Sequence, residues 1–442
     1  MSEKQIDDRS RRGAILAIVL IVVLIVTTLG SGMIALNGGS AVEVSKAISA
    51  AEAFWTAEAG LQAVKAVASE NRMPFDQFSL FSSDILSFNG SRFTCTIDGR
   101  TATVTFPAPA GYNNSINRVK LYNMTSVGTS EAGVTREVMI QSQIQTFASY
   151  MHASNFEQTT TGGNIYFGPD DVMNGTVYVN DQLNIYGDPL FLKRAFSADS
   201  SVNYLASSDR TGVDRDVFTR GLRLNAAALD FDDPDEHLDA LQQAAHSGGI
   251  ELSGSYSIVF NDNGTITYRP QISGGWGTPV TRDLASGNGA VYVSGDAYVS
   301  GEVRGSVTLA ARSDIFITND IVYASATVAD HSDAGFNDDA VSDSLGLIAK
   351  DGVEVTKLSE INIHGSILVT EGGFGCAGRY VSLGSPSINL YGGITQYRRG
   401  IVGQVGGNGF SKNYRYDDRL LVSPPAQFPY SAYEFSAWRE TR

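Results

Sequence analysis

Residues 289–323 read GAVYVSGDAYVSGEVRGSVTLAARSDIFITNDIVY, and their pattern of short strands decides the fold. Apolar side chains alternate in brief runs, as at Val291 and Val293, and small residues such as Gly295 and Gly305 separate the runs. A β-sandwich usually needs longer strands and wider turns. Short strands with small-residue corners favour a parallel β-helix, in which stacked coils bury the inward-facing side chains.

A short motif of the form apolar-Asn-apolar-aromatic-Gly recurs beyond residue 160. It occurs as LNIYG at 183–187, INIHG at 361–365 and INLYG at 388–392. The last two copies lie 27 residues apart, which suits one coil of a solenoid. We therefore expect a β-solenoid domain over residues 151–430. A helical and hairpin insertion interrupts it at 230–270, and a C-terminal tail follows at 431–442.

The overall composition agrees with a β-rich protein and excludes some partners. The chain has 442 residues, only 18% of them charged, together with 46 glycines, which suits tight turns between strands. Its net charge of −15 argues against nucleic acid, whose binding proteins need a basic surface. Two cysteines, Cys95 and Cys376, are too few for a disulfide scaffold, and whether they pair stays open.

The N-terminal region contains a long uncharged run. Residues 14–36 are apolar or small throughout and would span about 34 Å as a helix, enough for a hydrocarbon core of about 30 Å. A secretory signal has a shorter apolar core. Arg11 and Arg12 precede the run, so the positive-inside rule places residues 1–13 in the cytoplasm. Helical periodicity continues to residue 72, which predicts one helix over 14–72, apolar first and amphipathic afterwards.

This N-terminal pattern resembles a known family. Arg11-Arg12-Gly13, the uncharged run that starts at Ala14, and the motif AEAG (Ala57, Glu58, Ala59 and Gly60) are similar to PilX-type pilus assembly proteins, relatives of type IV pilins and type II pseudopilins. The resemblance implies a leader, residues 1–13, that prepilin peptidase removes between Gly13 and Ala14. It also implies packing with other pilin or pseudopilin subunits. Ile18 stands where major pilins carry Glu at the fifth mature position, which points to a minor or tip subunit.

The region that follows the helix predicts a small β-rich head. RFTCTIDGRTATVTF contains two alternating strands around Asp98-Gly99, a two-residue hairpin turn. Strands after a long helix resemble a pilin head, here over 73–150. The predicted fold class is thus mainly β: a pilin-like transmembrane helix, a β-hairpin region and a parallel β-helix.

The resemblance also sets the expected location and function. We expect a single-pass protein of the bacterial cytoplasmic (inner) membrane, with its N-terminus in the cytoplasm and its bulk extracytoplasmic, at the cell surface or on a pilus. Its partners would be the membrane, other pilin subunits and prepilin peptidase, with no nucleic acid. Its function would be that of a minor pilin or pseudopilin in a type IV pilus or related secretion filament, for assembly, capping or adhesion.

Candidate chemistry is confined to acidic loops. DHSDAGFNDDAVSD, at 330–343, places oxygen ligands between two strand regions and could hold Ca²⁺, but the pattern favours a solvated insertion. The calcium candidates in this loop are Asp330, Asp333, Asp338 and Asp339. No HExxH, GxSxG, P-loop or Cys/His metal spacing occurs, so we expect no catalytic residues, no other cofactor and no enzyme.

One enzymatic alternative stays open. β-Helix enzymes that act on polysaccharides combine clustered carboxylates with cations on one face. Arg379, Arg398 and Arg399 supply cations near the later coils, and the acidic loops could supply carboxylates. A membrane-anchored enzyme acting on polysaccharide is therefore the second hypothesis.

Overall fold

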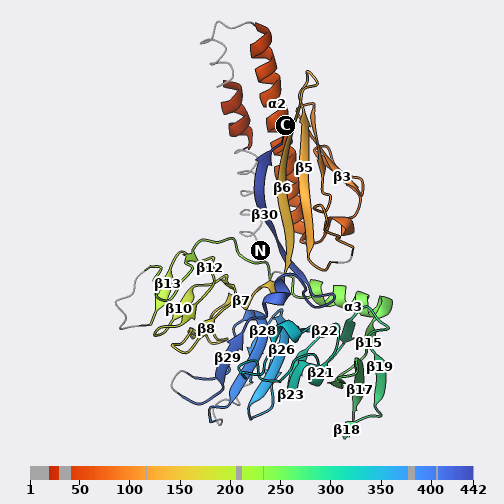
Figure 1. Ribbon diagram of the computed structural model, residues 1–442, viewed down its shortest axis with the longest axis vertical. Coiled ribbons are helices and arrows are strands. Elements are labelled where there is room, and N and C mark those ends of the chain that lie inside the picture. Colours follow the sequence, from red (N-terminus) through yellow and green to blue (C-terminus); the bar gives the residue numbers. More distant parts are fainter. Residues whose placement is uncertain are drawn as a thin grey trace. The chain divides into compact units, whose positions relative to one another are not determined.

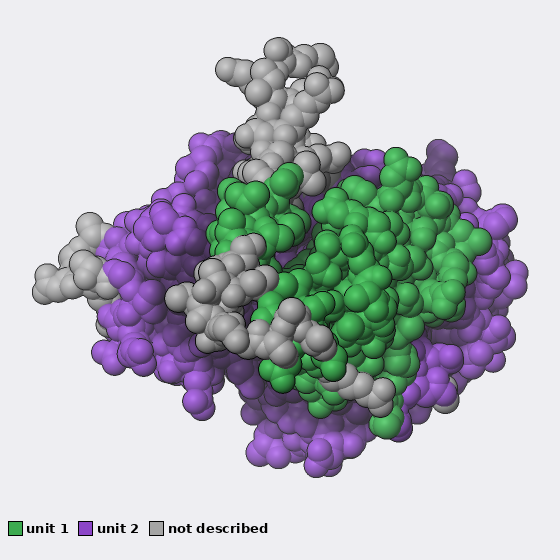
Figure 2. Space-filling view, turned by 90° about the horizontal axis from the view of Figure 1, so that it is seen from above, with its two compact units in different colours: residues 1–110, 121–142, 435–442 green, residues 111–120, 143–434 purple. Residues whose placement is uncertain are grey.

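The computed structural model describes residues 19–28, 41–115, 117–205, 212–231, 233–376, 384–404 and 407–441. The chain divides into two compact units, coloured separately in Figure 2. Unit 1 comprises residues 1–110, 121–142 and 435–442, and unit 2 comprises residues 111–120 and 143–434. Strands dominate both units, so the prediction of a mainly β protein is confirmed.

Unit 1 is built on a seven-stranded sheet with the order β1-β2-β3-β4-β5-β6-β30. The predicted hairpin is present: β3 and β4 pair antiparallel with Ile97 opposite Arg100, and Asp98 and Gly99 both take positive φ values in the turn. The last strand comes from the C-terminus, so residues 435–442 belong to this unit and are not a separate tail. The strands are β1 (Phe81–Ser82), β2 (Leu86–Phe88), β3 (Arg92–Ile97), β4 (Arg100–Thr105), β5 (Lys120–Thr129), β6 (Thr135–Thr146) and β30 (Tyr430–Glu440).

Helix α2 (Ala41–Asn71) packs against this sheet (Figure 1). Its buried side recurs every three or four residues, which is the spacing of one helix face. These residues have no exposed surface: Ala53, Ala57, Leu61, Val64 and Ala68. Small side chains on this face let the helix approach closely, and a Cβ added to Gly128 of β5 would lie 2.2 Å from the Ala53 carbonyl oxygen.

Two N-terminal predictions need correction. A single helix over 14–72 is not what the structure describes: residues 19–28 are helical, α2 begins at Ala41, and the residues between lie outside the described residues. Across the described part of the chain, no helix combines the length and the apolar character needed to cross a membrane. This finding overturns the predicted single-pass location in the bacterial cytoplasmic membrane.

Unit 2 contains one long ladder of parallel strands. Its spatial order is β15-β20-β22-β24-β26-β28-β7-β9-β12-β14. These strands are β7 (His152–Phe156), β9 (Val177–Val179), β12 (Ala195–Ser197), β14 (Leu222–Arg223), β15 (Ile250–Leu252), β20 (Ala290–Val293), β22 (Ser306–Ala311), β24 (Ser344–Ala349), β26 (Ile361–Val369) and β28 (Ser387–Arg398).

Further parallel strands lie in the connections between the strands of the long ladder, and they form ladders of their own. One ladder runs β16-β21-β23-β25-β27, and another joins β23 and the first halves of β26 and β28 to β29. Their bounds are β16 (Tyr256–Phe260), β21 (Ala297–Val303), β23 (Asp314–Tyr323), β25 (Gly352–Val355), β27 (Gly373–Gly375) and β29 (Ser411–Arg415). The side chains predicted to face inward, such as Val291, Val293, Ile315 and Ile317, are fully buried.

The remaining elements are short. Two parallel pairs are β8 (Val172–Met173) with β11 (Leu190–Phe191), and β10 (Leu183–Ile185) with β13 (Val202–Tyr204). The predicted helix and hairpin are present as α3 (Glu236–Gly248) and as β16 paired antiparallel with β17 (Thr265–Ile272). The edge strands β18 (Gly275–Trp276) and β19 (Val280–Asp283), and the 3-10 turns at Phe75–Gln77, Phe147–Ser149, Asp338–Ala340 and Asp418–Leu421, complete the described elements.

The long ladder does not follow the order of the sequence. The chain enters the ladder at β7, in its interior, and runs to one end at β14. It then passes through α3 to the opposite end at β15 and returns to β28. There β28 pairs with β7, with Ile394 opposite His152 and Gln396 opposite Ser154. We call this junction of the first and last rungs the seam.

The recurring Asn of the sequence motif forms a column of side-chain hydrogen bonds. Asn362 and Asn389 lie opposite each other in adjacent rungs, in the register that the 27-residue spacing predicts. The Asn389 side-chain amide donates to Asn362 over 2.9 Å, and that of Asn413 donates to Asn389 over 2.9 Å. A buried polar side chain thereby has a partner in each neighbouring rung.

Candidate functional site

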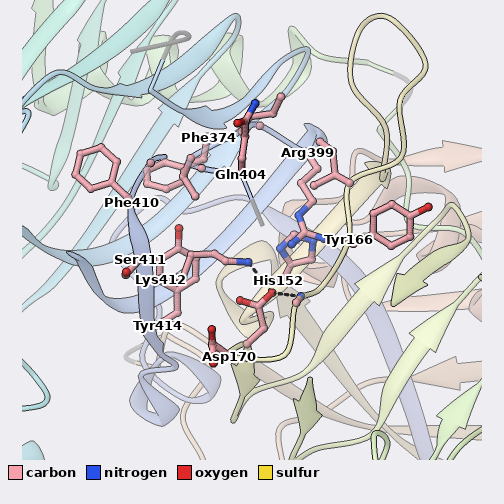
Figure 3. A pocket seen from close by; sticks show the side chains of 18 of the residues that line it. His152, Tyr166, Asp170, Phe374, Arg399, Gln404, Phe410, Ser411, Lys412 and Tyr414 are labelled. Atoms are coloured by element: carbon pink, nitrogen blue, oxygen red, sulfur yellow. Dashed lines mark hydrogen bonds and ion pairs between the residues drawn. The ribbon is translucent and has the colours of Figure 1, made fainter. Parts of the chain in front are cut away.

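A cavity of about 820 Å³ opens at the seam, and we call it the seam cavity. Its walls come from the start of β7, the 159–173 segment, the end of β28 and the 399–414 segment (Figure 3). Segments more than 200 residues apart in sequence therefore share one wall. The lining side chains used below are His152, Asn164, Tyr166, Asp170, Asp171, Tyr186, Ser385, Arg399, Gln404, Ser411, Lys412 and Tyr414.

A buried ion pair lies behind one wall of the cavity. The Arg399 guanidinium is 2.6 Å from the Glu157 carboxylate, whose side chain has no exposed surface. His152 Nε2 lies 2.9 Å from the other Glu157 oxygen, and the Ser154 hydroxyl donates to that oxygen. Burial alone would raise the pKa of Glu157, but Arg399 and these hydrogen bonds lower it to about 2. Glu157 is therefore ionised and fully partnered.

The same environment keeps His152 neutral. Burial lowers its pKa, against the opposing effect of Glu157, because a charged imidazole would lose its hydration. Its ring packs edge-to-face on Phe167, with 5.3 Å between ring centroids, and the Arg399 guanidinium lies 4.0 Å from the centroid of the same ring. One aromatic side chain thus supports both groups.

A second ion pair lies on the opposite side of the cavity. Lys412 Nζ is 2.5 Å from the Asp171 carboxylate, which also accepts the Gly168 N–H over 2.8 Å. Burial lowers the pKa of Lys412, and Asp171 opposes that change. Figure 3 shows Lys412 and Arg399 pointing toward the centre of the cavity from two sides. Each of these two cations is paired with a carboxylate, but only that of Lys412, Asp171, also lines the cavity.

The titratable groups at this cavity are held in contacts within the protein. Glu157 is sealed from the cavity and holds Arg399, so it cannot meet a substrate. His152 is held against that carboxylate, and its lowered pKa leaves it a weak base. The remaining lining offers aromatic rings, amides and hydroxyls around two neutralised ion pairs.

Three of the four calcium candidates, Asp330, Asp333 and Asp338, use their carboxylates in hydrogen bonds or an ion pair. Asp330 accepts the Ser332 N–H and Asp333 accepts the Gly335 N–H, each as an Asx turn. Asp338 accepts the Tyr391 hydroxyl over 2.8 Å and pairs with Arg415. Asp339 lies in the turn Asp338–Ala340, where its N–H donates to Asn337. Among the described residues, no three acidic, His or Cys side chains gather in a way that could hold a metal ion.

The other predicted site residues separate into two groups. Ala57 and Gly60 of AEAG face the sheet, Glu58 accepts the Trp438 indole N–H over 3.0 Å, and Ala59 is half-buried. The leader residues Arg11, Arg12, Gly13 and Ala14 lie outside the described residues, as does Arg379.

Of the cations in the enzyme hypothesis that the structure describes, Arg398 and Arg399 bond to partners outside the 330–343 loop, although Arg399 lines the seam cavity with Asp170 and Asp171. Arg399 pairs with Glu157, and Arg398 lies 4.8 Å from the Phe156 ring centroid and bonds nearby carbonyl groups. The acidic residues that start α3 pair elsewhere: Asp235 is 2.9 Å from Lys350. No sequence motif marks Glu157 or Lys412, because their partners are more than 240 positions away.

Comparison of the chain with protein-family models, with curated proteins and with solved structures finds no significant match.

Proposed function

We propose that the chain is a non-catalytic structural subunit of a pilus-type filament, in which a pilin-like unit 1 carries a parallel β-helix, unit 2. The proposal combines the N-terminal sequence pattern with the packing of α2. A filament subunit of this kind needs a helix with a head sheet packed against it.

The packing of α2 on the unit 1 sheet is the observation that carries the proposal. Ala57 and Gly60 of the AEAG motif are fully buried or in close contact on that sheet, and the Ser126 hydroxyl of β5 donates to the Ala57 carbonyl over 2.6 Å. A substituted Gly60 would place its Cβ 2.5 Å from that of Ala102. The motif that suggests the family is thus the part of the helix on which the head is built.

Two features support the β-helix as a carried domain. Its rungs are parallel and in register, with small residues at the turns between short strands. Its chain enters after β6 and leaves into β30, and these strands are neighbours in the unit 1 sheet. Antiparallel pairing of the two is supported by the Thr441 N–H bond to the Glu137 carbonyl and the Phe147 N–H bond to the Pro429 carbonyl.

Mass spectrometry of the mature N-terminus tests this function. In cells with active prepilin peptidase we expect a chain that begins at Ala14, and in peptidase-deficient cells a chain that retains residues 1–13. Gly13→Leu should abolish the cut, while Gly30→Leu, a matched change within the apolar run, should leave it intact. Identical N-termini in both strains would overturn the proposal.

The polysaccharide-enzyme alternative receives no comparable support. It requires carboxylates and a cation facing one substrate cleft. Arg399 faces the seam cavity together with Asp170 and Asp171, but it is paired with Glu157, and Asp171 is paired with Lys412. Asp338 of the acidic loop pairs with Arg415 and Tyr391.

A further inference from the structure

We propose that the seam cavity binds a short neutral glycan. This inference rests on the cavity alone and goes beyond the filament role, so either proposal can fail without the other. The volume of the seam cavity, about 820 Å³, lies within the range of roughly 300–1,000 Å³ that is usual for small-molecule sites. The nature of the ligand follows from the charge, the rings and the polar groups of the lining.

Both lining cations are paired with carboxylates, Arg399 with Glu157 and Lys412 with Asp171, and Asp170 adds one further carboxylate, which disfavours a strongly charged ligand. Two cations, Arg399 and Lys412, and two acids, Asp170 and Asp171, face the cavity, while His152 is neutral. An anionic ligand would approach two carboxylates, and a cationic ligand would approach the guanidinium and the ammonium group. A neutral ligand with many hydroxyls can donate to the carboxylates and accept from the cations at once.

The aromatic side chains offer faces to the apolar side of a sugar ring. Tyr166 is half-buried and Tyr186 is 38% exposed, so both offer surface to a ligand, whereas Tyr414 lines the cavity while packing against the apolar core. Figure 3 places Tyr166 and Tyr414 on different sides of the cavity. A pyranose has an apolar face of C–H groups and a rim of hydroxyls, and an amphipathic tyrosine suits both.

The remaining lining supplies neutral hydrogen-bonding groups. Asn164 and Gln404 contribute side-chain amides, and Ser385 and Ser411 contribute hydroxyls, all of which both donate and accept. Five glycines also line the cavity and, having no side chains, leave room for a ligand there: Gly168, Gly400, Gly403, Gly407 and Gly409. Such a lining matches the alternating donors and acceptors of a glycan.

Titration calorimetry on the full chain tests the proposal, with defined trisaccharides as probes. Neutral maltotriose, cellotriose, mannotriose and N,N′,N″-triacetylchitotriose are compared with acidic trigalacturonate. We expect at least one neutral trisaccharide to bind with a Kd at or below about 1 mM, and trigalacturonate to bind at least about tenfold more weakly. Absence of binding by all four neutral probes, or a preference for trigalacturonate, would overturn the proposal.

Two cavity variants and one control locate the binding site. Tyr166→Ala should weaken binding about three- to tenfold, the effect of one lost aromatic contact, and Gln404→Ala provides a second change with a different side chain. Trp276→Ala removes an aromatic of similar exposure (40%) that does not line the cavity, and should leave the Kd unchanged. Equal losses in all three variants, with native circular dichroism, would place binding elsewhere and contradict the inference.

Discussion

The Arg399 guanidinium lies 2.6 Å from the Glu157 carboxylate, although 242 positions separate the two residues. The pair joins β28, the last strand of the ladder in sequence, to β7, the first, beside the backbone pairing of these two strands. Lys412 and Asp171 repeat the connection 241 positions apart. The seam is therefore held by two ion pairs with little exposed surface as well as by backbone hydrogen bonds.

Loss of the Glu157 charge should weaken the seam strongly. Glu157→Gln leaves the Arg399 guanidinium buried without a counter-charge, and removing one partner of such a pair costs about 3–5 kcal/mol. Urea unfolding followed by circular dichroism measures the change. Glu251→Gln, in the exposed pair with His246, is the matched control and should leave the midpoint where it is. Equal midpoints for the two variants would show that the seam pair contributes nothing.

Acidification should destabilise the protein through His364. This side chain is fully buried, and its Nδ1 accepts the Tyr323 N–H over 3.1 Å, so the proton sits on Nε2, which faces the Ala329 carbonyl at 2.8 Å. Burial lowers the pKa of His364 from 6.5 to about 4. The unfolded chain therefore binds a proton first as the pH falls, and stability drops between about pH 6.5 and pH 4 by up to about 3 kcal/mol.

Thermal unfolding across this pH range checks the effect of His364. His364→Gln should reduce the decline in midpoint, since one titrating group is gone, while His152 and His331, whose pKa values burial also lowers, retain part of it. His246→Gln, at an exposed histidine, should retain the full slope. A slope that persists unchanged in His364→Gln would assign it to other groups.

A side chain at Gly128 should disrupt the packing of α2. The Cβ of Gly128→Ala would lie 2.2 Å from both the Ala53 carbonyl oxygen and the Ala57 nitrogen, which are backbone atoms that cannot turn aside. We expect a loss of about 1–3 kcal/mol in the free energy of unfolding. Gly384→Ala meets no atom within 4 Å and serves as the control. Calorimetry that found the two variants equally stable would contradict this packing.

Calcium should have no effect on the stability of the acidic loop. Its carboxylates already accept loop N–H groups or pair with Arg415, as at Asp330 and Asp338. We expect the same melting temperature in 5 mM EDTA and in about 100-fold excess Ca²⁺, because a bound ion would raise it by mass action. An increase with Ca²⁺ that disappears in Asp330→Asn would restore the calcium interpretation.

Local sequence patterns predicted much of the secondary structure. Asp98-Gly99 marked a hairpin because a two-residue turn needs two positive φ values, and these two residues adopt them readily. The INIHG and INLYG copies predicted the register of adjacent rungs because each rung repeats the same inward and outward alternation. The turn and the repeated motif each depend on a few contiguous residues, so both can be recognised in the sequence.

The order of the rungs could not be predicted in the same way. Every parallel strand presents the same row of N–H and C=O groups on each edge, so the edge of β28 accepts β7 as readily as the next strand in sequence. The seam cavity depends on this choice, which is why neither Glu157 nor Lys412 stood out as a site residue. AEAG, by contrast, lies within one helix, and its small residues could be recognised directly.

The seam in the interior of the ladder also affects how this domain could change during evolution. The strands that precede and follow the ladder in sequence, β6 and β30, are paired neighbours in the unit 1 sheet. A coil gained or lost toward β14 or toward β15 would lengthen or shorten one arm without separating those two strands. The domain can therefore vary in length by whole repeats while its point of attachment stays the same.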